Sequence, residues 1–511
     1  MRVTRRLCCQ LAATTVLGGS AVFIGFLFHR RHVSVNRPRA PHRITAPFLT
    51  GEVAVHASVP IKHQIQRFLV LWIRLMQLSI RLSWAVVVLV YSSAAAVNAA
   101  HDAMLQFLTE CGPTYIKLGQ WLASRPDLFS PEMCRVLAKL FDHAPAHSWD
   151  HTNKVLRDEG VLVHLASIES MPINSGSVAQ VHRGVLRNDV DGIPAGTAVA
   201  VKVLHPDIHS TIAADLAIMR LGVRLLEAVV PGAVYFDFRR ALDEFGALLQ
   251  SQLDLRRECD NLAQFRYNFR DFSGVCFPTP APTITTSAVL VETFEEGIPF
   301  QTFIRQGSDE GLADIGCHMF LKMLFEDNFV HSDLHPGNVL VRKHAKGSKL
   351  VVLDPGLVTV LSPVERDNFI SLFAAVACGD GDLGAGLMLD RMPRGNDVLD
   401  RDKFKLEVKR IFDEVAPGTA GFRLSDVDIG AVLSRLLNAV RKHHATIDGN
   451  FASLVVTVIV GEGLGRRLDA NFNMFEEAAP YMIQYLEAGE LKFLAAKLSE
   501  MFGRRVMGQT S

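Results

Sequence analysis

The stretch HSDLHPGN at residues 331–338 and the stretch LDPG at residues 353–356 decide the fold expected for this chain. A short segment with the pattern of a β-hairpin separates them. Asp333 and Asn338 stand five residues apart in the first stretch, and Asp354 follows in the second. Carboxylate and amide oxygens are hard ligands that suit Mg²⁺, and a carboxylate beside a hydroxyl group can accept its proton. We therefore predict that Asn338 and Asp354 hold a metal ion and that Asp333 is catalytic.

The spacing of these residues matches the catalytic machinery of protein kinases. Kinases carry H-R-D-x-x-x-x-N in the catalytic loop and a metal-binding aspartate in a following D-F-G. Asp333 and Asn338 reproduce the first spacing, and Asp354 takes the place of the second aspartate. A role as turn-forming residues alone explains the hairpin but not this order and spacing. The pattern therefore indicates phosphoryl transfer.

Upstream, a strand and a glycine loop supply the expected nucleotide contacts. Residues 199–202 read VAVK, the pattern of the kinase strand whose lysine binds nucleotide phosphates. Residues 174–181 read NSGSVAQV and align with G-x-G-x-x-G-x-V. They keep only the middle glycine, Gly176, where the backbone must approach phosphate, so we expect a stiffer loop than in other kinases. The residues expected to contact the nucleotide are Gly176, Ser177, Val181, Lys202 and Glu292, and Lys202 is also expected to be catalytic.

The order of the predicted elements indicates an α+β fold, two-lobed and like that of an atypical protein kinase, with a helical N-terminal extension. Strand patterns at 179–186, 197–204 and 288–292 indicate a small antiparallel sheet, and helical patterns fill 209–270. The predicted divisions are a targeting segment or membrane anchor at 1–50, a helical extension at 60–145, an N-lobe with inserted helices at 165–292, a helical C-lobe at 293–490 and a tail at 491–511.

Motifs outside this core give the chain a family resemblance. Residues 111–120, CGPTYIKLGQ, contain the sequence KxGQ. Residues 252–258 read QLDLRRE, and residues 462–469 read EGLGRRLD. Together with HSDLHPGN at 331–338, these motifs resemble the UbiB/aarF-domain family of atypical kinases over residues 100–490. Several separated motifs in one order make coincidence a poor explanation.

The resemblance implies more than the residues do by themselves. It implies a protein-kinase-like fold, binding of ATP or ADP with Mg²⁺, a mitochondrial or bacterial membrane setting, and support of ubiquinone (coenzyme Q) biosynthesis. The implied partners are a nucleotide, a membrane lipid or quinone-type small molecule, and other ubiquinone-biosynthesis proteins. In the family, the KxGQ extension lies across the active-site cleft and disfavours protein substrates. Here that regulatory extension is carried by Lys117, Gly119 and Gln120.

Three departures from the family pattern bear on catalysis. The family has E-x-D where this chain has Gln252-x-Asp254, so the glutamate expected to pair with Lys202 is replaced by a neutral amide. Because charge-assisted hydrogen bonds are about twice as strong as neutral ones, the lysine loses support unless Asp254 or Glu258 compensates. The alanine-rich nucleotide loop of the family reads NSGS, and D-F-G reads DPG, in which Pro355 fixes the backbone. These changes resemble a divergent eukaryotic branch of the family.

The segment after the metal-binding aspartate is predicted to be short. Ser362-Pro363 has the pattern of a helix start and lies eight residues after Asp354. Protein kinases place a long activation segment ending in A-P-E at this point, and this motif is missing here. We therefore expect little platform for a peptide substrate.

The composition argues against nucleic acid as a partner and against a zinc or redox site built from cysteine pairs. Lys plus Arg and Asp plus Glu number 53 each, so the formal net charge is +0 and no net field attracts a polyanion. Nucleic acid is therefore not an expected partner. The eight cysteines form no CxxC pair of the kind that marks zinc or redox sites. We expect reduced, structural thiols, although an even count in a secreted chain also permits bridges.

Two apolar segments bear on membrane contact. The first 50 residues carry arginines and no acidic residue, which is typical of a mitochondrial targeting segment. Within them 7–28 is uncharged and long enough for a membrane anchor, so we expect association with the mitochondrial inner membrane. A secretory signal or signal anchor is the alternative. A second uncharged stretch at 82–100 fits a span, a membrane-surface helix or a buried helix.

Three functions remain in order of preference. The first is a mitochondrial, membrane-associated atypical kinase or ATPase that supports ubiquinone or related lipid metabolism. The alternative is a nucleotide-binding pseudokinase scaffold without turnover, motivated by Gln252 and the altered glycine loop. A kinase acting on proteins fits least well because the segment after Asp354 is short.

Overall fold

The computed structural model describes residues 61–89, 93–127, 129–141, 146–229, 238–306, 310–344, 347–390, 400–415, 429–443, 445, 447, 449–469, 472 and 474–488. The predicted targeting segment at 1–50 and the tail at 491–511 lie outside these residues. The chain divides into two compact units, one formed by Met1–Ile116 with Asp207–Gly246 and the other by Lys117–Pro206 with Ala247–Ser511. The domain boundaries expected from the sequence stay predictions.

The first unit is built around helices α2 (Ile61–Leu89), α3 (Ser93–Cys111) and α7 (Ile208–Val229), with α2 packed against both others. Arg67 of α2 donates from Nε and Nη2 to the two carboxylate oxygens of Asp215 on α7, at 2.6 and 2.8 Å. Because Asp215 is fully buried, this paired arrangement ties the two helices together.

The apolar stretch at 82–100 is divided between the end of α2 and the start of α3. Among the helices in the described part of the chain, none combines the length and the apolar character needed to cross a bilayer. Residues 82–89 and 93–100 therefore belong to two different helices, and neither helix is a candidate membrane span.

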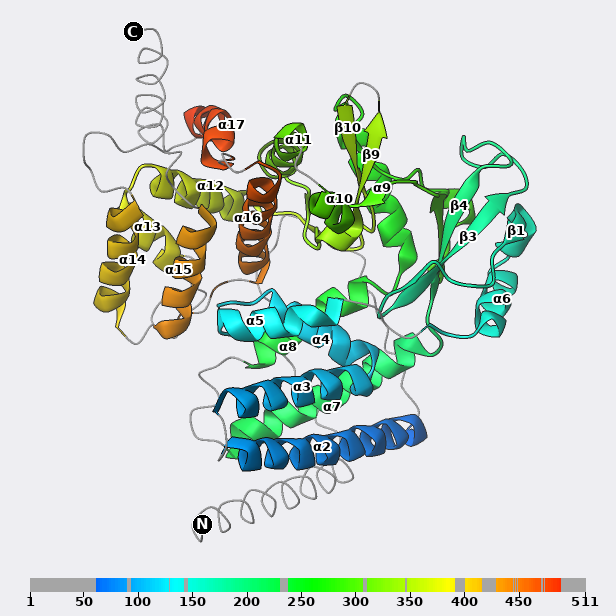
Figure 1. Cartoon of the computed structure of the whole chain (residues 1–511), viewed down its shortest axis with the longest axis horizontal. Helices are drawn as coiled ribbons and strands as arrows, with labels where there is room; N and C mark the ends of the chain where they lie inside the picture. Colours follow the sequence, from blue (N-terminus) through cyan, green and yellow to red (C-terminus); the bar gives the residue numbers. More distant parts are fainter. Residues whose placement is uncertain are drawn as a thin grey trace, which may run out of the picture. The chain divides into compact units, whose positions relative to one another are not determined.

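The second unit contains an antiparallel sheet in the order β1-β3-β4-β6, with a short β2 beside β3 (Figure 1). Its strands are β1 (Leu165–Ile168), β2 (Asn174–Ser175), β3 (Ala179–Leu186), β4 (Ala198–Leu204) and β6 (Val289–Thr293). Val199, Val201 and Val203 of β4 are fully buried in an apolar core shared with Leu156 of α6 (Trp149–Asp158). Side chains alternate along a strand, so Lys202 projects from the other face. The predicted strands are confirmed.

The rest of this unit is mainly helical, with one four-stranded sheet and one pair of two-residue strands. The hairpin β9 (Val339–His344) and β10 (Gly347–Val352) separates the two motif stretches as predicted. It is extended by β5 (Val275–Cys276) and β7 (Ile298–Pro299), and β8 (Val330–His331) pairs with β11 (Val358–Thr359). The helices are α5 (Pro131–Leu137), α9 (Leu255–Asn268), α10 (Phe300–Gln306), α11 (Glu310–Leu321), α12 (Pro363–Ala377), α13 (Gly381–Asp390), α14 (Arg401–Val415), α15 (Ile429–Lys442), α16 (Gly449–Leu468) and α17 (Met474–Ala488). Two further helices, α4 (Pro113–Ala123) and α8 (Phe238–Ser251), have residues in both units.

Ser-Pro pairs begin two helices, and the helix start predicted at Ser362-Pro363 is confirmed. Ser130 Oγ accepts a hydrogen bond from the backbone N–H of Met133 at the start of α5. Ser362 and Glu365 form a reciprocal capping box at the start of α12, which satisfies two backbone donors that the helix leaves free. The segment between Asp354 and α12 is therefore as short as predicted, and it carries only the two-residue strand β11.

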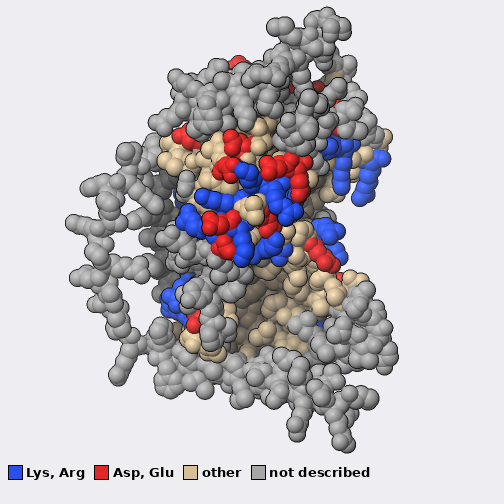
Figure 2. All heavy atoms as spheres, turned by 90° about the vertical axis from the view of Figure 1, so that its left-hand side faces the viewer, with Lys and Arg blue, Asp and Glu red and all other residues tan. Residues whose placement is uncertain are grey.

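One charged face is visible in Figure 2, where Lys and Arg are interspersed with Asp and Glu. Ion pairs of this kind join neighbouring helices: Lys409 pairs with Asp382, and Lys442 Nζ lies 2.7 Å from Glu407. Acidic and basic side chains therefore neutralise one another over α13, α14 and α15.

Candidate nucleotide and metal site

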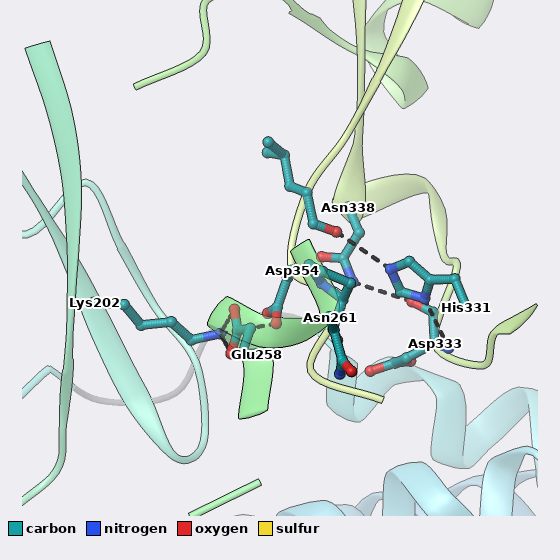
Figure 3. Close-up of polar contacts among 9 residues, drawn as sticks. Lys202, Glu258, Asn261, His331, Asp333, Asn338 and Asp354 are labelled. Carbon is teal, nitrogen blue, oxygen red and sulfur yellow. Dashed lines mark hydrogen bonds and ion pairs between the residues drawn. The ribbon is translucent and has the colours of Figure 1, made fainter. Parts of the chain in front are cut away.

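Three charged residues that are far apart in the sequence meet beside β4, an inner strand of the sheet (Figure 3). Lys202 Nζ donates to both carboxylate oxygens of Glu258, each at 2.8 Å, and to Asp354 Oδ1, also at 2.8 Å. Glu258 is buried in the first turn of α9, and Asp354 is about half exposed after β10. One lysine thus joins the sheet, a helix and the DPG stretch.

Glu258 supplies the carboxylate partner of Lys202, which is one of the two alternatives that the sequence left open. Gln252 precedes α9, and its buried Oε1 has no hydrogen-bond partner in the described residues. Asp254 is the N-cap of α9 and accepts from the backbone N–H of Arg256 at 3.2 Å. Glu258 lies one turn into the helix, so its side chain reaches the lysine, whereas the two earlier residues do not contact it. The ion pair is therefore intact despite Gln252.

Negative charge exceeds positive charge around Lys202. Burial raises the pKa of Glu258 to about 7, with the nearby Asp354 adding to the rise and Lys202 opposing it. Burial, and then the charge of Glu258, raise the pKa of Glu292 well above its ordinary value. Burial opposes ionisation of Asp354, but the charge of Lys202 outweighs it and lowers the pKa of that carboxyl. Against burial, Asp354 and Glu258 raise the pKa of Lys202. A bound cation would reduce the repulsion between these carboxylates.

The stretch at 331–338 is held by its own hydrogen bonds. Asn338 Nδ2 donates to the carbonyl oxygen of Asp333 at 3.1 Å. The backbone N–H of Asp333 donates to His331 Nδ1 at 3.2 Å, so His331 carries its hydrogen on Nε2 and donates to the carbonyl of Leu353 at 3.3 Å. Burial lowers the pKa of His331, which keeps this neutral form. The stretch is thereby fixed to the residue that precedes Asp354.

The backbone of Asp354 is strained and supported from α9. Its φ is 52°, in the left-handed region that non-glycine residues rarely adopt. Asn261 Nδ2 donates to the carbonyl oxygen of Pro355 at 2.8 Å and so holds the next peptide in place. Asn261 follows Glu258 by three residues, so both lie on one face of α9. Sequence reasoning missed Asn261, although this helical spacing was a usable signal.

A pocket collects most of the residues that the sequence singled out. Its open volume is about 620 Å³, including space open to solvent at its mouth. The predicted residues that line it are Lys117, Gly176, Ser177, Val181, Lys202, Gln252, Glu258, Asp333 and Asp354. Gly119, Gln120, Asp254, Glu292 and Asn338 are not among its lining residues. Gln120 instead donates from Nε2 to the carbonyl of Leu140 at 2.8 Å, within the helical extension.

The glycine loop leaves polar groups without partners. Ser175 and Ser177 are 9% and 6% exposed, and the hydroxyl of each has no hydrogen-bond partner in the described residues. A side chain at Gly176 would make only an ordinary 3.5 Å contact with the carbonyl oxygen of Ala179. The fold itself therefore does not require glycine at position 176.

A lysine from the sheet, a glutamate from the following helix and two motif stretches around one pocket are the arrangement of a protein-kinase-like fold. Comparisons with known sequences identify the family. Residues 139–383 match the ABC1 atypical kinase-like domain, and residues 414–473 match the UbiB helical domain. The chain belongs to the ABC1 family of atypical kinases, with the α+β fold and helical N-terminal extension predicted above.

Relatives of the chain share most of its length. It is 32% identical over 444 residues to a mitochondrial ABC1 family protein of Schizosaccharomyces pombe, with 73% of this chain and 64% of that protein covered. It is 31% identical over 453 residues to a mitochondrial ABC1 family protein of Saccharomyces cerevisiae, with 76% and 68% covered. It is 29% identical to the probable protein kinase UbiB of Vibrio vulnificus, with 75% and 70% covered. The chain thus spans about two thirds of the length of these curated relatives.

Proposed function

We propose that this chain is an atypical kinase or ATPase that binds ATP or ADP with Mg²⁺. The observation that carries the proposal is the meeting of Lys202, Glu258 and Asp354 in a pocket also lined by Asp333. A lysine held by two carboxylates is aimed and kept charged for a phosphate group. Asp333 is the carboxylate offered to the hydroxyl group of an acceptor.

The donor set fits a magnesium ion shared with phosphates. Asp354 supplies a half-exposed carboxylate, and the side-chain nitrogen of Asn338 is already used by Asp333, so its Oδ1 is the atom left for a cation. In the described residues, no group of three or more His, Cys, Asp or Glu side chains is arranged to hold a metal by itself. Mg²⁺ is commonly held by one or two protein oxygens together with substrate phosphates. When bound, the ion would neutralise phosphate charge.

A small acceptor at a mitochondrial membrane fits the surroundings of the pocket. Lys117 of the KxGQ motif lines it, so the helical extension takes up part of its border. The short segment before α12 offers little support for an extended peptide. Two relatives carry the word mitochondrial in their names. We therefore propose association with the mitochondrial inner membrane and a role in ubiquinone or related lipid metabolism.

Nucleotide binding is tested by calorimetry on the full chain with ADP, with and without Mg²⁺. Asp354→Asn is expected to weaken Mg²⁺-dependent binding about tenfold or more. The matched control is Asp271→Asn, which alters a carboxylate that is 88% exposed and lies outside the pocket. If the wild type and Asp354→Asn bound ADP with equal Mg²⁺-dependent affinity, the assignment of this carboxylate as a metal ligand would be wrong.

Turnover separates the enzyme from the scaffold. ATP hydrolysis is measured with vesicles and quinone-like head groups, for the wild type and for Asp333→Asn. Hydrolysis that is lost in the variant while ADP still binds supports the enzyme. Nucleotide binding without hydrolysis in the wild type favours the pseudokinase scaffold, and efficient phosphorylation of a protein in trans would favour a protein kinase.

A further inference from the structure

A chain of hydrogen bonds that includes two imidazole rings leads from α6 to the glycine loop at residues 174–179. His147 lies just before α6, and His205 follows β4. Their Nδ1 atoms are 2.6 Å apart. His147 Nε2 lies 2.8 Å from Thr152 Oγ1, and His205 Nε2 lies 2.8 Å from the carbonyl oxygen of Gly176. The chain therefore ends on a residue of the pocket.

One arrangement of hydrogens satisfies this chain when the imidazoles are neutral. The carbonyl oxygen of Gly176 can only accept, so His205 carries its hydrogen on Nε2 and accepts at Nδ1. His147 must then donate from Nδ1, which leaves its Nε2 to accept the hydroxyl hydrogen of Thr152. The hydrogen bonds thus run in one direction, from Thr152 through His147 and His205 to Gly176.

Buried groups of β3 hold the start of the chain. Gln180 is fully buried; its Oε1 accepts from the backbone N–H of His147 at 2.8 Å, and its Nε2 donates to Thr152 Oγ1 at 3.2 Å and to His182 Nε2 at 3.0 Å. His182 in turn donates from Nδ1 to the carbonyl of Glu169 at 2.8 Å. The ring of His147 is therefore fixed in position before it meets the next imidazole.

The surroundings keep the imidazoles neutral. Burial, followed by the neighbouring His205, lowers the pKa of His147 to about 3. Burial also lowers the pKa of His205 and of His182. The titratable groups that face the pair in the described residues are His151 on α6 and His182 on β3, both of them basic. A proton on the pair therefore gains no compensating carboxylate from these neighbours.

His205 donates hydrogen bonds to the glycine-loop residues on both sides of Ser177. Its backbone N–H donates to the carbonyl of Val178 at 2.9 Å, while its Nε2 donates to the carbonyl of Gly176. In a trans peptide the C=O of Gly176 and the N–H of Ser177 point in opposite directions. Fixing the carbonyl on His205 therefore turns this N–H away from the imidazole. In the described residues the N–H and the buried hydroxyl of Ser177 have no partner, and Ser177 lines the pocket.

We propose that His205, oriented by His147 and Thr152, is a positioning residue that presents the N–H and hydroxyl of Ser177 to the phosphate groups of a nucleotide. The role rests on the proposed nucleotide binding and deepens it. His205 contacts the loop and does not itself line the pocket. We therefore expect it to affect the binding of the phosphate groups and not the binding of the nucleoside.

The test compares ligands with and without phosphate. Affinities of the full chain for ADP with Mg²⁺ and for adenosine are measured for the wild type, His205→Leu and His205→Gln. His205→Leu keeps the size but removes the donor, so ADP affinity is expected to fall about tenfold while adenosine affinity stays unchanged. His205→Gln restores an N–H donor and is expected to recover most of the ADP affinity. His164→Gln, a histidine outside the chain of hydrogen bonds, is the control.

Thr152→Val supplies a second variant with nearly the wild-type shape, in case His205→Leu fails to fold. It removes the hydroxyl that hydrogen-bonds to His147 Nε2 and is expected to give a smaller, ADP-selective loss. Equal losses for ADP and adenosine in both variants, or unchanged ADP affinity in folded variants, would overturn the positioning role. A wild type that binds neither ligand would instead overturn the proposed nucleotide site, and the positioning role with it.

Discussion

The catalytic stretch at 331–338 and the glycine loop at 174–179 border one pocket but are held in opposite ways. In the catalytic stretch, His331 and Asn338 satisfy backbone groups of the stretch and of the neighbouring hairpin. In the glycine loop, two buried serine hydroxyls have no partner in the described residues. The backbone of this loop is held by a hydrogen bond from His205, which lies outside the loop. The backbone of the first is therefore held by its own hydrogen bonds, whereas the second keeps donors free for a ligand.

His331→Leu should give the largest loss of stability and so tests the catalytic side of this comparison. His331 is fully buried and pairs with the backbone N–H of Asp333 and the carbonyl of Leu353. Leucine leaves both part-buried backbone groups without the partners that His331 supplied, so the free energy of unfolding is expected to fall by about 2–4 kcal/mol. Urea unfolding measures the change.

The matched control for that variant is His335→Asn in the same stretch. His335 Nδ1 accepts from the backbone N–H of Gly337, and an asparagine oxygen can accept the same hydrogen bond. Its stability is expected to stay within about 0.5 kcal/mol of the wild type. A His331→Leu protein as stable as this control would show that the catalytic stretch does not depend on its own hydrogen bonds.

Gly176→Ala tests the glycine loop and is expected to leave stability within about 0.5 kcal/mol of the wild type. The added methyl group meets only the carbonyl oxygen of Ala179 at 3.5 Å, and the backbone at Gly176 is not left-handed. If the glycine serves the approach of a phosphate, ADP affinity should fall about tenfold in calorimetry. A loss of stability with unchanged ADP affinity would reverse the assignment and make Gly176 a structural residue.

Acid should weaken the fold gradually, and the histidines behind the glycine loop are one cause. The pKa of His147 is lowered to about 3 in the folded chain from the ordinary 6.5. The unfolded chain therefore binds more protons below pH 6.5, so stability that is present above this pH is lost as pH falls toward 3. His147→Asn is expected to flatten this part of the urea-midpoint profile and to leave the profile above pH 7 unchanged. An equal slope in both proteins would contradict a neutral His147.

Local patterns were sufficient to predict the strands and the helix start at Ser362. The alternation in 198–204 and the Ser-Pro pair at Ser362 each depend on residues close in sequence, and the structure confirms both. The sequence named both Asp254 and Glu258 as candidate partners of Lys202 and could not choose between them, because the choice depends on where α9 begins and which turn faces the sheet. The bond from His205 to Gly176 joins positions 29 residues apart across two strands, and no local pattern marks it. Motif spacing thus indicated the members of the site but not the contacts that orient them.

Ser177→Ala should have the smallest effect on the stability of the free protein. It tests whether the glycine loop keeps a hydroxyl donor free for a ligand. Its buried hydroxyl has no partner in the described residues, so alanine removes an unsatisfied group and the free energy of unfolding should change by less than about 0.5 kcal/mol or rise slightly. With ADP and Mg²⁺, the thermal stabilisation of the variant should be smaller than that of the wild type, because one phosphate donor is gone. Ser79→Ala is the control for a serine outside the pocket. If Ser177→Ala destabilised the free protein as strongly as His331→Leu, the hydroxyl would have a partner within the fold, and the distinction between the two loops would fail.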